Sequence, residues 1–394
     1  MATSTQVRFD ALDPLSLNAQ LTEEERLIRD TTRAYVRDRF LPSIAEHYEH
    51  GTFPETVPQE LGELGLLGMH LTGYGCAGAS ATAYGLTCLE LEAGDSGLRS
   101  FCSVQGSLAM YAIHRWGSEE QKEHWLPELA QGNAIGCFGL TEPDVGSNPA
   151  AIRTRARRDG SGWSLDGTKM WITNGSIADV AVVWARTEDG DIAGFLVERD
   201  TPGFTTPAMH QKLSLRASVT SELVLDGVRV GHENRLPHTS SLRGPLSCLN
   251  EARYGIVWGA AGAATACYES ARSYALTREQ FGKPIASFQL TQAKLVEMSV
   301  KVNMSTLLAL QLGRLKDAGA LSSEQVSFGK YHNVSAALDV ARTARQILGA
   351  NGITLEYPAL RHANNLESVL TYEGTHEMHT LILGQAITGI AAFQ

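Results

Sequence analysis

The sequence has little charge for its length and lacks several features that mark large protein classes. Only 19% of its 394 residues are Asp, Glu, Lys or Arg, against about a quarter in typical soluble proteins. The net charge is -10, which argues against the broad basic surface that nucleic-acid binding uses. We therefore expect no nucleic-acid partner, and we infer that part of this weakly charged surface is buried against other subunits.

Membrane and secretion signals are also missing. Residues 1–18 lack the basic and apolar regions of a secretory signal. No apolar run reaches the roughly 18 residues that a membrane span needs, and the nearest, Gly255–Tyr268, is short and rich in Gly and Ala. The six cysteines form no CxxC pair, so we expect reduced, mostly buried thiols. These absences predict a cytoplasmic protein with no stable membrane association.

Familiar catalytic and nucleotide-binding motifs are absent too. The chain has no GxSxG elbow, no Walker loop and no GxGxxG after a predicted strand, which removes support for the common hydrolase and nucleotide-triphosphate functions. His376 and His379 are three residues apart, a spacing that metal-binding helices can use. No third ligand accompanies them at a known spacing, so we expect no metal site.

The periodicity of apolar residues divides the chain into three blocks. Residues 1–135 predict a helical domain, whose first helix begins at a capping box formed by Thr22 and Glu25. Residues 136–240 predict a small antiparallel β domain, because short β-branched segments alternate with Gly, Asp and Asn. Residues 241–394 predict a bundle of long helices. The resulting fold class is α+β and multidomain, without the alternating βα pattern of a parallel sheet.

The segments behind this division are short in the middle block and long in the last. The expected helices are Pro58–Leu67, Ala81–Ala93, Ser107–Arg115, Glu119–Ala130, Glu251–Leu276, Phe288–Asp317, Ser323–Leu348 and Met378–Phe393. The expected strands are Arg153–Arg158, Gly162–Leu165, Ala181–Ala185, Ile192–Glu198 and Ser221–Val230. The arginines of the first strand alternate with Thr154 and Ala156, so we interpret them as a solvated strand face rather than a phosphate site.

Five short segments rich in Trp, Thr, Gly and acidic residues stand out. They are Cys137–Pro143, Trp171–Asn174, Arg278–Gly282, Leu348–Gly352 and Tyr372–His376. In this order, they resemble the acyl-CoA dehydrogenase family over essentially the whole chain, and most closely its glutaryl-CoA dehydrogenase branch. The resemblance implies an N-terminal α-helical domain, a middle β domain and a C-terminal four-helix bundle, assembled as a homotetramer (a dimer of dimers). It also implies noncovalent FAD, an acyl-CoA substrate, and electron-transfer flavoprotein as the partner that receives the electrons.

The resemblance assigns the catalytic base to Glu373. Removal of the α proton of a thioester needs a strong base, and a carboxylate screened from water has a raised pKa. Gly374 would let substrate approach the backbone, and the N–H of Glu373 would polarise the thioester carbonyl. Tyr372 and Arg253 are expected beside the substrate. An exposed acid at a helix start, where the helix dipole favours it, is the alternative role for Glu373.

The family pattern also implies a flavin site. The residues expected to hold FAD are Phe138, Leu140, Thr141, Gly146, Ser147, Trp171, Ile172, Thr173, Arg278, Gln280, Phe281, Gln289, Gln346, Gly349, Thr375 and Glu377. Thr141 and Thr173 would hydrogen-bond the isoalloxazine ring, and Trp171 would pack against it. The residues between 278 and 349 would reach the FAD of a neighbouring subunit. Core packing and strand propensity are the ordinary alternatives for these residue types.

Arg99 carries the expectation about the acyl group. A dicarboxylic acyl chain ends in an anion that is costly to bury without a cation, and arginine forms forked, charge-assisted pairs with carboxylates. By resemblance, Arg99 binds this carboxylate, with Ser103 and Glu92 in the same pocket. The alternative is an exposed i,i+4 ion pair between Asp95 and Arg99.

The acyl group stays open because nearby residues depart from the glutaryl-CoA pattern. The departures are Asn148, Leu98, Phe101, Cys102 and the loop Gly73–Gly78, and we expect them to border the pocket. One possibility is oxidative decarboxylation of glutaryl-CoA to crotonyl-CoA. Others are dehydrogenation of another carboxylated or short branched acyl thioester, on CoA or a carrier protein, without decarboxylation. A DNA-binding flavoprotein of this fold conflicts with the acidic net charge, and a nitroalkane-type oxidase would carry Asp in place of Glu373.

Overall fold

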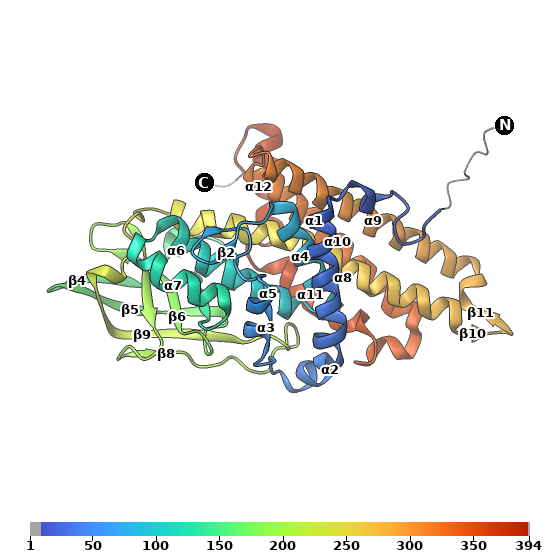
Figure 1. Cartoon of the computed structure of the whole chain (residues 1–394), viewed down its shortest axis with the longest axis horizontal. Coiled ribbons are helices and arrows are strands. Elements are labelled where there is room, and N and C mark those ends of the chain that lie inside the picture. The colour runs from blue at the N-terminus through green and yellow to red at the C-terminus, as the bar shows by residue number, and fades with distance from the viewer. Residues whose placement is uncertain (1–8, 393–394) are drawn as a thin grey trace.

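Helices make up most of the molecule, and a β-sheet occupies one end of its long axis (Figure 1). The computed structural model describes residues 9–392. The helices that precede the sheet are α1 (Glu23–Tyr35), α2 (Leu41–His50), α3 (Val57–Glu63), α4 (Ala81–Gly94), α5 (Ser96–Ser103), α6 (Tyr111–Trp116) and α7 (Glu119–Gln131). The helices that follow it are α8 (Arg243–Thr277), α9 (Gln289–Asp317), α10 (Ser323–Leu348), α11 (Pro358–Thr371) and α12 (His376–Thr388).

The first helix begins where the sequence predicted. The hydroxyl of Thr22 accepts from the N–H of Glu25, and the Glu25 carboxylate accepts from the N–H of Thr22 at 2.8 Å. Two backbone donors at the helix start are thereby satisfied, which confirms the capping box. Helix α1 then continues through a π-helical turn, Val36–Phe40, into α2, which ends at Gly51 with φ of 68°.

A single long helix replaces the predicted Ser107–Arg115 segment. Helices α5 and α6 are joined by a π-helical stretch, Val104–Met110. The Gln105 side chain in this stretch donates to the carbonyls of Leu129 and Ala134 at 2.9 Å and accepts from the N–H of Gly136 at 2.8 Å. Gln105 therefore fixes the entry of the chain into the sheet from the helical region.

The sheet has seven strands and mixed pairing. Its strands are β3 (Gly136–Gly139), β4 (Arg155–Asp159), β5 (Gly162–Thr173), β6 (Val180–Thr187), β7 (Ile192–Glu198), β8 (Phe204–Thr205) and β9 (Thr220–Gly231). They follow the order β3-β6-β4-β5-β9-β8, with β7 also paired to β6. Most pairs are antiparallel, as expected, but β6 pairs in parallel with both β3 and β4. Along β4 only Ala156 is buried, which confirms the solvated arginine face.

Strand β5 is longer than the sequence predicted. The expected strand ended at Leu165, whereas β5 continues to Thr173. Its pairing with β9 shifts register between Lys169 and Ile172, and Trp171 within this bulge has φ of 64°. Bulges of this kind turn a side chain away from its regular alternation. The prediction failed because polar residues after Leu165 and this bulge interrupt the two-residue period.

One helix of the last block was missed, and two differ in length. Helix α11 escaped prediction because Arg361, His362 and Asn365 are buried in it, so its inward face does not look apolar in the sequence. Helix α8 begins at Arg243, eight positions before the predicted Glu251. Helix α12 stops at Gly389, a C-cap with φ of 73°; the predicted end at Phe393 lies outside the described residues.

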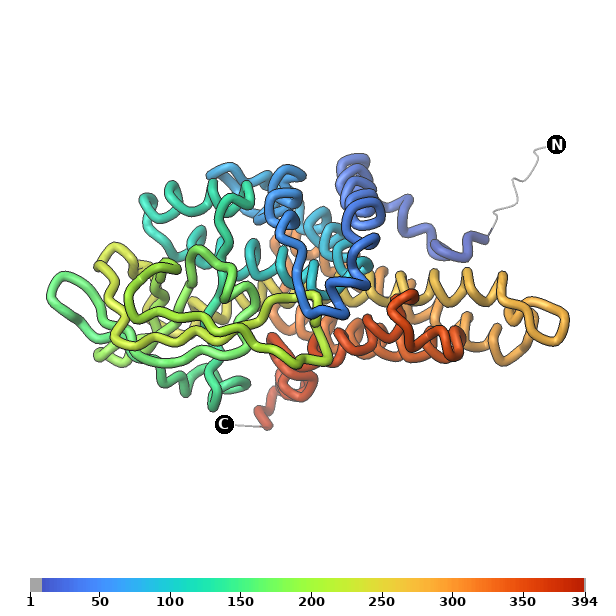
Figure 2. The backbone as a smooth tube through the Cα atoms, turned by 90° about the horizontal axis from the view of Figure 1, so that it is seen from below, coloured from blue at the N-terminus to red at the C-terminus, as the bar shows by residue number. Residues whose placement is uncertain are grey.

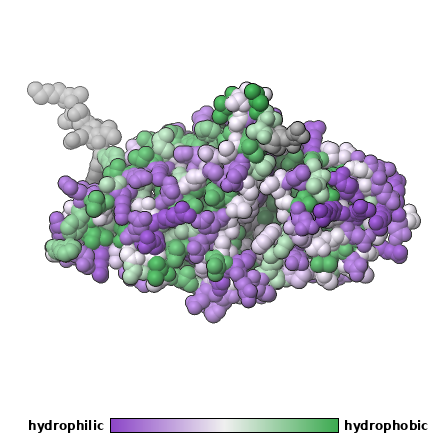
Figure 3. All heavy atoms as spheres, turned by 180° about the vertical axis from the view of Figure 1, so that it is seen from behind, coloured by the Kyte–Doolittle hydropathy of each residue, from purple (hydrophilic) through white to green (hydrophobic). Residues whose placement is uncertain are grey.

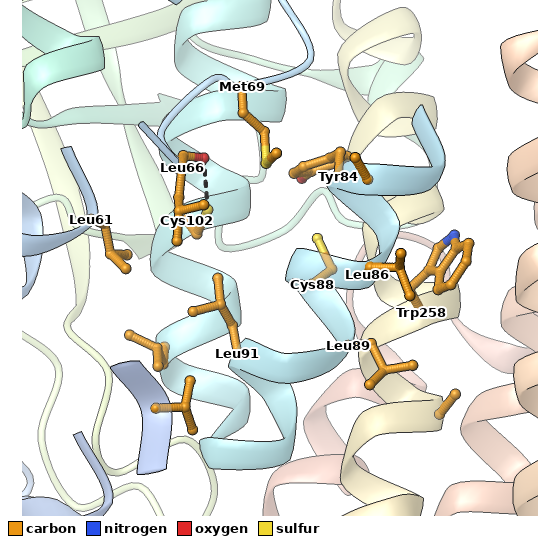
Figure 4. Packing of buried hydrophobic residues seen from close by; sticks show 14 of the residues in the cluster. Leu61, Leu66, Met69, Tyr84, Leu86, Cys88, Leu89, Leu91, Cys102 and Trp258 are labelled. Atoms are coloured by element: carbon orange, nitrogen blue, oxygen red, sulfur yellow. Dashed lines mark hydrogen bonds between the residues drawn. The ribbon is translucent and has the colours of Figure 1, made fainter. Parts of the chain in front are cut away.

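Helices α4 and α8 approach closely through glycines. A Cβ on Gly262 would lie 1.9 Å from the carbonyl oxygen of Leu89, and a Cβ on Gly85 would lie 2.2 Å from the Trp258 ring. Figure 4 shows Trp258 of α8 beside Leu86 and Leu89 of α4 in this core. The same core extends to α5, where the Cys102 thiol donates to the carbonyl of Leu66 at 3.6 Å. These contacts join the helices before the sheet to those after it.

The surface mixes hydrophilic and hydrophobic residues, as one face shows in Figure 3. Several apolar side chains are exposed at the end of the molecule opposite the sheet and along α9: Phe281, Leu290, Val296, Val300 and Met304. All six cysteines are free thiols, five of them buried, as expected. Within residues 9–392, none of the helices combines the length and apolar character of a membrane span.

A glycine-to-alanine substitution tests the close helix contact. Gly262→Ala should lower the free energy of unfolding by about 1–3 kcal/mol, because the added methyl group meets backbone and forces α4 and α8 apart. Gly384→Ala in α12 is the matched control, since no atom lies within 4 Å of its added Cβ. The control should be neutral or slightly stabilising. Denaturant unfolding of both variants checks this, and equal stabilities would contradict it.

Candidate active site

A short turn between α11 and α12 holds Glu373 in an unusual backbone conformation. Glu373 has φ of 51° and Gly374 has φ of 93°. The next residue, Thr375, begins α12 by accepting the N–H of Met378 on its hydroxyl at 3.2 Å. A left-handed conformation is rare for a residue with a side chain and costs energy. The surrounding structure must therefore hold the Glu373 side chain where it points.

Two cations, half-buried Arg253 and buried Lys330, hold this turn by its backbone oxygens. The Arg253 guanidinium of α8 donates from Nε to the Glu373 carbonyl at 2.7 Å. The Lys330 ammonium of α10 donates to the Gly374 carbonyl at 2.7 Å. Gly374 itself is tightly enclosed, since a Cβ there would lie 2.9 Å from Nε2 of His379. Only glycine fits both the space and the backbone angle at this position.

The Glu373 carboxyl group is placed to take up a proton. Its Oε2 atom is buried and has no hydrogen-bond partner among the described residues. Burial raises the pKa of Glu373, because the charged form loses its hydration, while Arg99, Lys330 and Arg253 oppose that rise. The alternative of an exposed acid in the first turn of a helix does not describe this side chain, since Glu373 precedes the N-cap of α12.

A buried ion pair lies next to this turn. Arg99, which is 1% exposed, donates from Nε to the carboxylate of the fully buried Glu92 at 2.6 Å. The Arg99 guanidinium also donates to the hydroxyl of Tyr372, the residue before Glu373. Glu92 accepts a second hydrogen bond from the Ser96 hydroxyl at 2.8 Å. The pair thus connects α4 and α5 to the turn that carries Glu373.

The alternative pairing of Arg99 with Asp95 is wrong. Asp95 is itself buried, and it accepts from Arg361 and from the side chain of Asn365 at 2.9 Å. Both partners belong to α11, which the sequence analysis missed. Ser103 lies one turn after Arg99 in α5, and its buried hydroxyl has no hydrogen-bond partner within residues 9–392. A cation and an unpaired hydroxyl therefore share one face of this helix.

The departures from the glutaryl-CoA pattern in α5 belong to the core. Leu98 is fully buried in the cluster that α4 and α8 share. Phe101 stacks on Phe53 at 5.2 Å, and Cys102 contacts the Leu66 carbonyl. Leu98 and Phe101 do not border the pocket as expected, because they occupy a different face of the helix from Arg99 and Ser103. The departing loop Gly73–Gly78 lies in a hairpin of β1 (Thr72–Gly73) and β2 (Cys76–Ala77), and this hairpin contacts α7.

Several predicted flavin residues come together on the sheet. Phe138 and Leu140 are buried at and just after β3, and the Thr141 carbonyl accepts from the N–H of Met170 at 2.9 Å. Gly146 and Ser147 lie exposed in the following turn, and Ile172 is buried beside the β5 bulge. The two segments Phe138–Thr141 and Trp171–Thr173 are therefore neighbours in space.

The residues present here fit a flat aromatic cofactor such as a flavin. The Trp171 side chain is 58% exposed although tryptophan usually buries most of its surface, and the bulge conformation keeps it outward. An exposed indole offers a broad apolar face for ring stacking. Within residues 9–392, neither the Thr141 nor the Thr173 hydroxyl is engaged with another protein group, so both are free to bind polar ring atoms.

A second group of predicted flavin residues lies at the opposite end of the molecule. Arg278, Gln280 and Phe281 belong to a hairpin of β10 (Glu279–Gln280) and β11 (Lys283–Pro284), far from the sheet in Figures 1 and 2. Gln289 follows at the start of α9. Gln346 and Gly349 lie near the same end, since Asn351 donates to the Tyr274 hydroxyl at 3.2 Å, close before the hairpin. One chain therefore does not bring the two groups together.

The remaining predicted residues adjoin the Glu373 turn. Thr375 caps α12, and Glu377 is exposed in its first turn. His376 stacks on Tyr331 of α10, with ring centroids 4.1 Å apart. His379 is 1% exposed under Gly374. No group of three or more potential metal-ligating His, Cys, Asp or Glu side chains occurs in the described part of the chain.

Two buried lysines with a role in the site were not predicted. Lys169 of β5 donates to the Leu140 carbonyl at 3.2 Å and to Glu142 at 2.8 Å, so it connects the two segments that were predicted to hold the flavin. Burial lowers the pKa of Lys169 to about 8, although Glu142 favours its charged form. Lys330 contacts the Glu373 turn. A charged residue inside an otherwise half-buried strand was a usable signal for Lys169, but no local pattern marked Lys330.

Comparisons with known proteins cover nearly the whole chain. Residues 22–133, 137–228 and 243–388 match the N-terminal, middle and C-terminal domains of acyl-CoA dehydrogenase, respectively. A crystal structure of glutaryl-CoA dehydrogenase from Mycobacterium smegmatis is 65% identical, with a TM-score of 0.96 over 98% of this chain and 100% of that one. A second glutaryl-CoA dehydrogenase from the same organism, in complex with FADH2, is 59% identical, with the same TM-score and coverage. The short-chain specific acyl-CoA dehydrogenase of Bos taurus is 34% identical over 93% of this chain and 90% of its own.

Removing one partner tests the buried ion pair. Glu92→Ala should lower the free energy of unfolding by about 3–5 kcal/mol, because Arg99 would remain buried without its carboxylate. Asp38→Ala is the control, since Asp38 pairs with Arg37 on the exposed surface, and surface pairs contribute about 0–1 kcal/mol. Denaturant unfolding measures both. A Glu92→Ala variant as stable as the control would contradict the assignment.

Proposed function

The chain belongs to the acyl-CoA dehydrogenase family, and from this premise we propose that it oxidises glutaryl-CoA with Glu373 as the base and FAD as the electron acceptor. The observation that carries the choice of substrate is the buried Arg99, whose guanidinium lies beside the Glu373 turn through its contact with Tyr372. A buried cation near the base suits an acyl chain that ends in a carboxylate. The high identity to two glutaryl-CoA dehydrogenases supports the same choice.

Glu373 would remove the α proton of the acyl thioester. Its carboxyl group is screened from water, which raises its pKa and makes the carboxylate a stronger base. The backbone N–H of Glu373 would polarise the thioester carbonyl, which stabilises charge that develops on that oxygen. Bound FAD would supply the acceptor for the two electrons that leave with the β hydrogen. This chain contributes the base, its orientation and the exclusion of water.

Arg99 would bind the far end of the acyl chain. Its Nε donates to Glu92 and one Nη group donates to Tyr372, so the remaining Nη hydrogens are left for a carboxylate ligand. The unpaired Ser103 hydroxyl on the same helix face would donate a second hydrogen bond. Because the Glu92–Arg99 pair is neutral overall, a bound carboxylate adds one negative charge that Arg253 and Lys330 help to balance.

Decarboxylation would follow from the same residues. After dehydrogenation the terminal carboxylate is attached to the γ carbon, next to the new α,β double bond. When the bond between the γ carbon and the carboxylate breaks, carbon dioxide leaves, and the electron pair delocalises through the double bond into the thioester as a dienolate. Protonated Glu373 would return its proton at the γ carbon and give crotonyl-CoA. The second candidate, supported by the 34% identity to a short-chain enzyme, is dehydrogenation of a short or otherwise carboxylated acyl thioester without loss of carbon dioxide.

The assembly we propose is a homotetramer in which subunits share flavin sites. The hairpin residues Arg278–Phe281 lie at the end of the molecule away from Trp171, and Phe281 is 92% exposed. A neighbouring subunit would bring that hairpin to the adenosine end of the FAD held by the first sheet. Electrons would then pass to electron-transfer flavoprotein in the cytoplasm. Size-exclusion chromatography coupled to light scattering gives the subunit number, and a monomer that retains FAD would contradict the shared site.

The choice of acyl group is tested by flavin bleaching. The purified yellow protein, mixed without oxygen with glutaryl-CoA or butyryl-CoA, should bleach faster with glutaryl-CoA. In the double variant Glu92→Gln/Arg99→Met, which replaces the ion pair by neutral groups of similar size, kcat/KM for glutaryl-CoA should fall about 100-fold, as expected for the loss of about 3 kcal/mol of charged hydrogen bonding. The value for butyryl-CoA should change little.

The opposite preference would favour the second candidate. A wild type that bleaches with butyryl-CoA and not with glutaryl-CoA would overturn the assignment of Arg99. Mass spectrometry of the product separates crotonyl-CoA from the thioester that retains its carboxylate. The mass therefore decides whether decarboxylation occurs.

Glu373→Gln tests the base directly. The amide keeps the size of the side chain but cannot accept the α proton, so turnover should fall by at least about 1000-fold. FAD should stay bound, because Glu373 is not among the groups that hold it. The flavin spectrum of the purified variant is the control for binding. Activity near that of wild type would refute the role of Glu373.

A further inference from the structure

Lys330 is a buried cation that the proposed reaction does not use. It belongs to α10, and the whole residue is 2% exposed. Its ammonium group donates to the carbonyls of three consecutive residues: Tyr372, Glu373 at 3.4 Å and Gly374 at 2.7 Å. An ammonium group has three hydrogens to donate. All of the donors of Lys330 are therefore directed at the backbone on either side of the proposed base.

The position of these carbonyls explains why a cation suits them. They follow the last turn of α11, which ends at Thr371. The C-terminal end of a helix carries the negative end of its dipole, which favours a cation nearby. Residues 372–374 are half-buried, and Lys330 reaches their carbonyls from the interior of the protein. Lys330 supplies both the hydrogen bonds and the opposite charge.

The same contacts stabilise the left-handed conformation of Glu373. The turn has positive φ at two successive residues, Glu373 and Gly374. Such a turn persists only where its surroundings fix it. Arg253 holds one of its carbonyls at 2.7 Å, and Lys330 is the only other cation that donates to it among the described residues. Without Lys330, the Tyr372 and Gly374 carbonyls would lose a buried donor.

We propose that Lys330 is a positioning residue for the dehydrogenation: it fixes the Tyr372–Gly374 turn and places a positive charge beside Glu373. In this way it determines both the direction in which the base points and the pH at which the base is ionised. The inference rests on the proposed function of Glu373. Lys330 would act through the turn, because its ammonium group donates to backbone carbonyls.

The charges around Glu373 determine the direction of the pH effect. Arg99 from α5, Arg253 from α8 and Lys330 from α10 favour the carboxylate, whereas Glu92 from α4 disfavours it. His379 of α12 stays neutral, because burial and the nearby cations lower its pKa to about 3. Burial likewise lowers the pKa of Lys330 to about 7, against the attraction of Glu373. Lys330 is thus charged on the acid side of neutrality.

Loss of the Lys330 charge therefore raises the pKa of Glu373 further. The carboxylate is the active form of the base, so the rate falls as pH drops through the pKa of Glu373. This fall in rate is the acid limb of the pH–rate profile, and a higher pKa of Glu373 moves it to higher pH. Loss of the hydrogen bonds has a separate effect: the base is less well oriented at every pH, and the maximal rate falls.

Three substitutions separate charge from hydrogen bonding. Lys330→Met keeps the length of the side chain but removes charge and donors, Lys330→Gln keeps donors without charge, and Lys330→Arg keeps both. Lys301→Met in α9 is the matched control. It breaks an exposed ion pair, 2.9 Å long, with Asp339, which lies in α10 as Lys330 does. The readouts are bound flavin, kcat and KM with glutaryl-CoA, and the rate of anaerobic flavin bleaching between about pH 5 and 8.

The expected result is a loss of kcat that has its own pH signature. In Lys330→Met, kcat should fall about 100-fold, as for a base displaced by about 1 Å, with KM changed less than about threefold and the acid limb at higher pH. Lys330→Gln should recover part of kcat but keep the displaced limb. Lys330→Arg should restore the limb. Lys301→Met should match wild type.

Two results would overturn the inference. The first is a Lys330→Met variant with bound flavin and the kcat and acid limb of wild type. The second is a lower kcat with an unmoved acid limb in both Lys330→Met and Lys330→Gln, which would leave only a structural role. If Lys330→Met does not fold, the limbs of the Gln and Arg variants decide: different limbs support the inference, and equal limbs overturn it. A wild type inactive with every acyl-CoA would instead remove the proposed function, and this inference with it.

Discussion

The structure depends on shielding the Glu373 carboxyl group from most water, with its Oε2 atom buried, while leaving it able to ionise. Burial of Glu373 disfavours its charge, and isolated buried charges are very costly. Cations from three helices offset that cost: Arg99 of α5, Arg253 of α8 and Lys330 of α10. Among the described residues, none of these cations forms an ion pair with the Glu373 carboxylate. Its buried Oε2 atom has no hydrogen-bond partner there either. The base is thus stabilised by charge at a distance and remains open to a substrate proton.

Close helix packing makes this arrangement possible. Glycines let α4 and α8 approach until backbone nearly touches backbone at Gly262. On the same face of α8, a Cβ on Gly259 would lie 1.9 Å from the Glu92 carboxylate, so only glycine leaves room for the Glu92–Arg99 pair. The ion pair then reaches the turn through Tyr372. Helix spacing, the ion pair and the orientation of the base therefore form one connected set of contacts.

The sequence predicted features whose cause is local and missed those whose cause is not. The capping box at Thr22 and the exposed arginine face of β4 follow from neighbouring residues, and both were predicted correctly. Helix α11 was missed because its buried polar side chains are satisfied by Asp95, far away in sequence. Arg99 was singled out by resemblance, but its partner is Glu92 rather than Asp95. Lys330 gave no signal, because its partners are backbone carbonyls, which every residue has.

Burial makes Glu373 a stronger base than an ordinary glutamate, while the surrounding cations keep it ionisable. The most direct measurement is the pH dependence of anaerobic flavin bleaching by glutaryl-CoA in the wild-type protein. We expect the rate to fall on the acid side with a midpoint above the usual pKa of a glutamate, about 4.3, and we expect this fall to be absent from the residual rate of Glu373→Gln. A midpoint at or below that of an ordinary glutamate would contradict it.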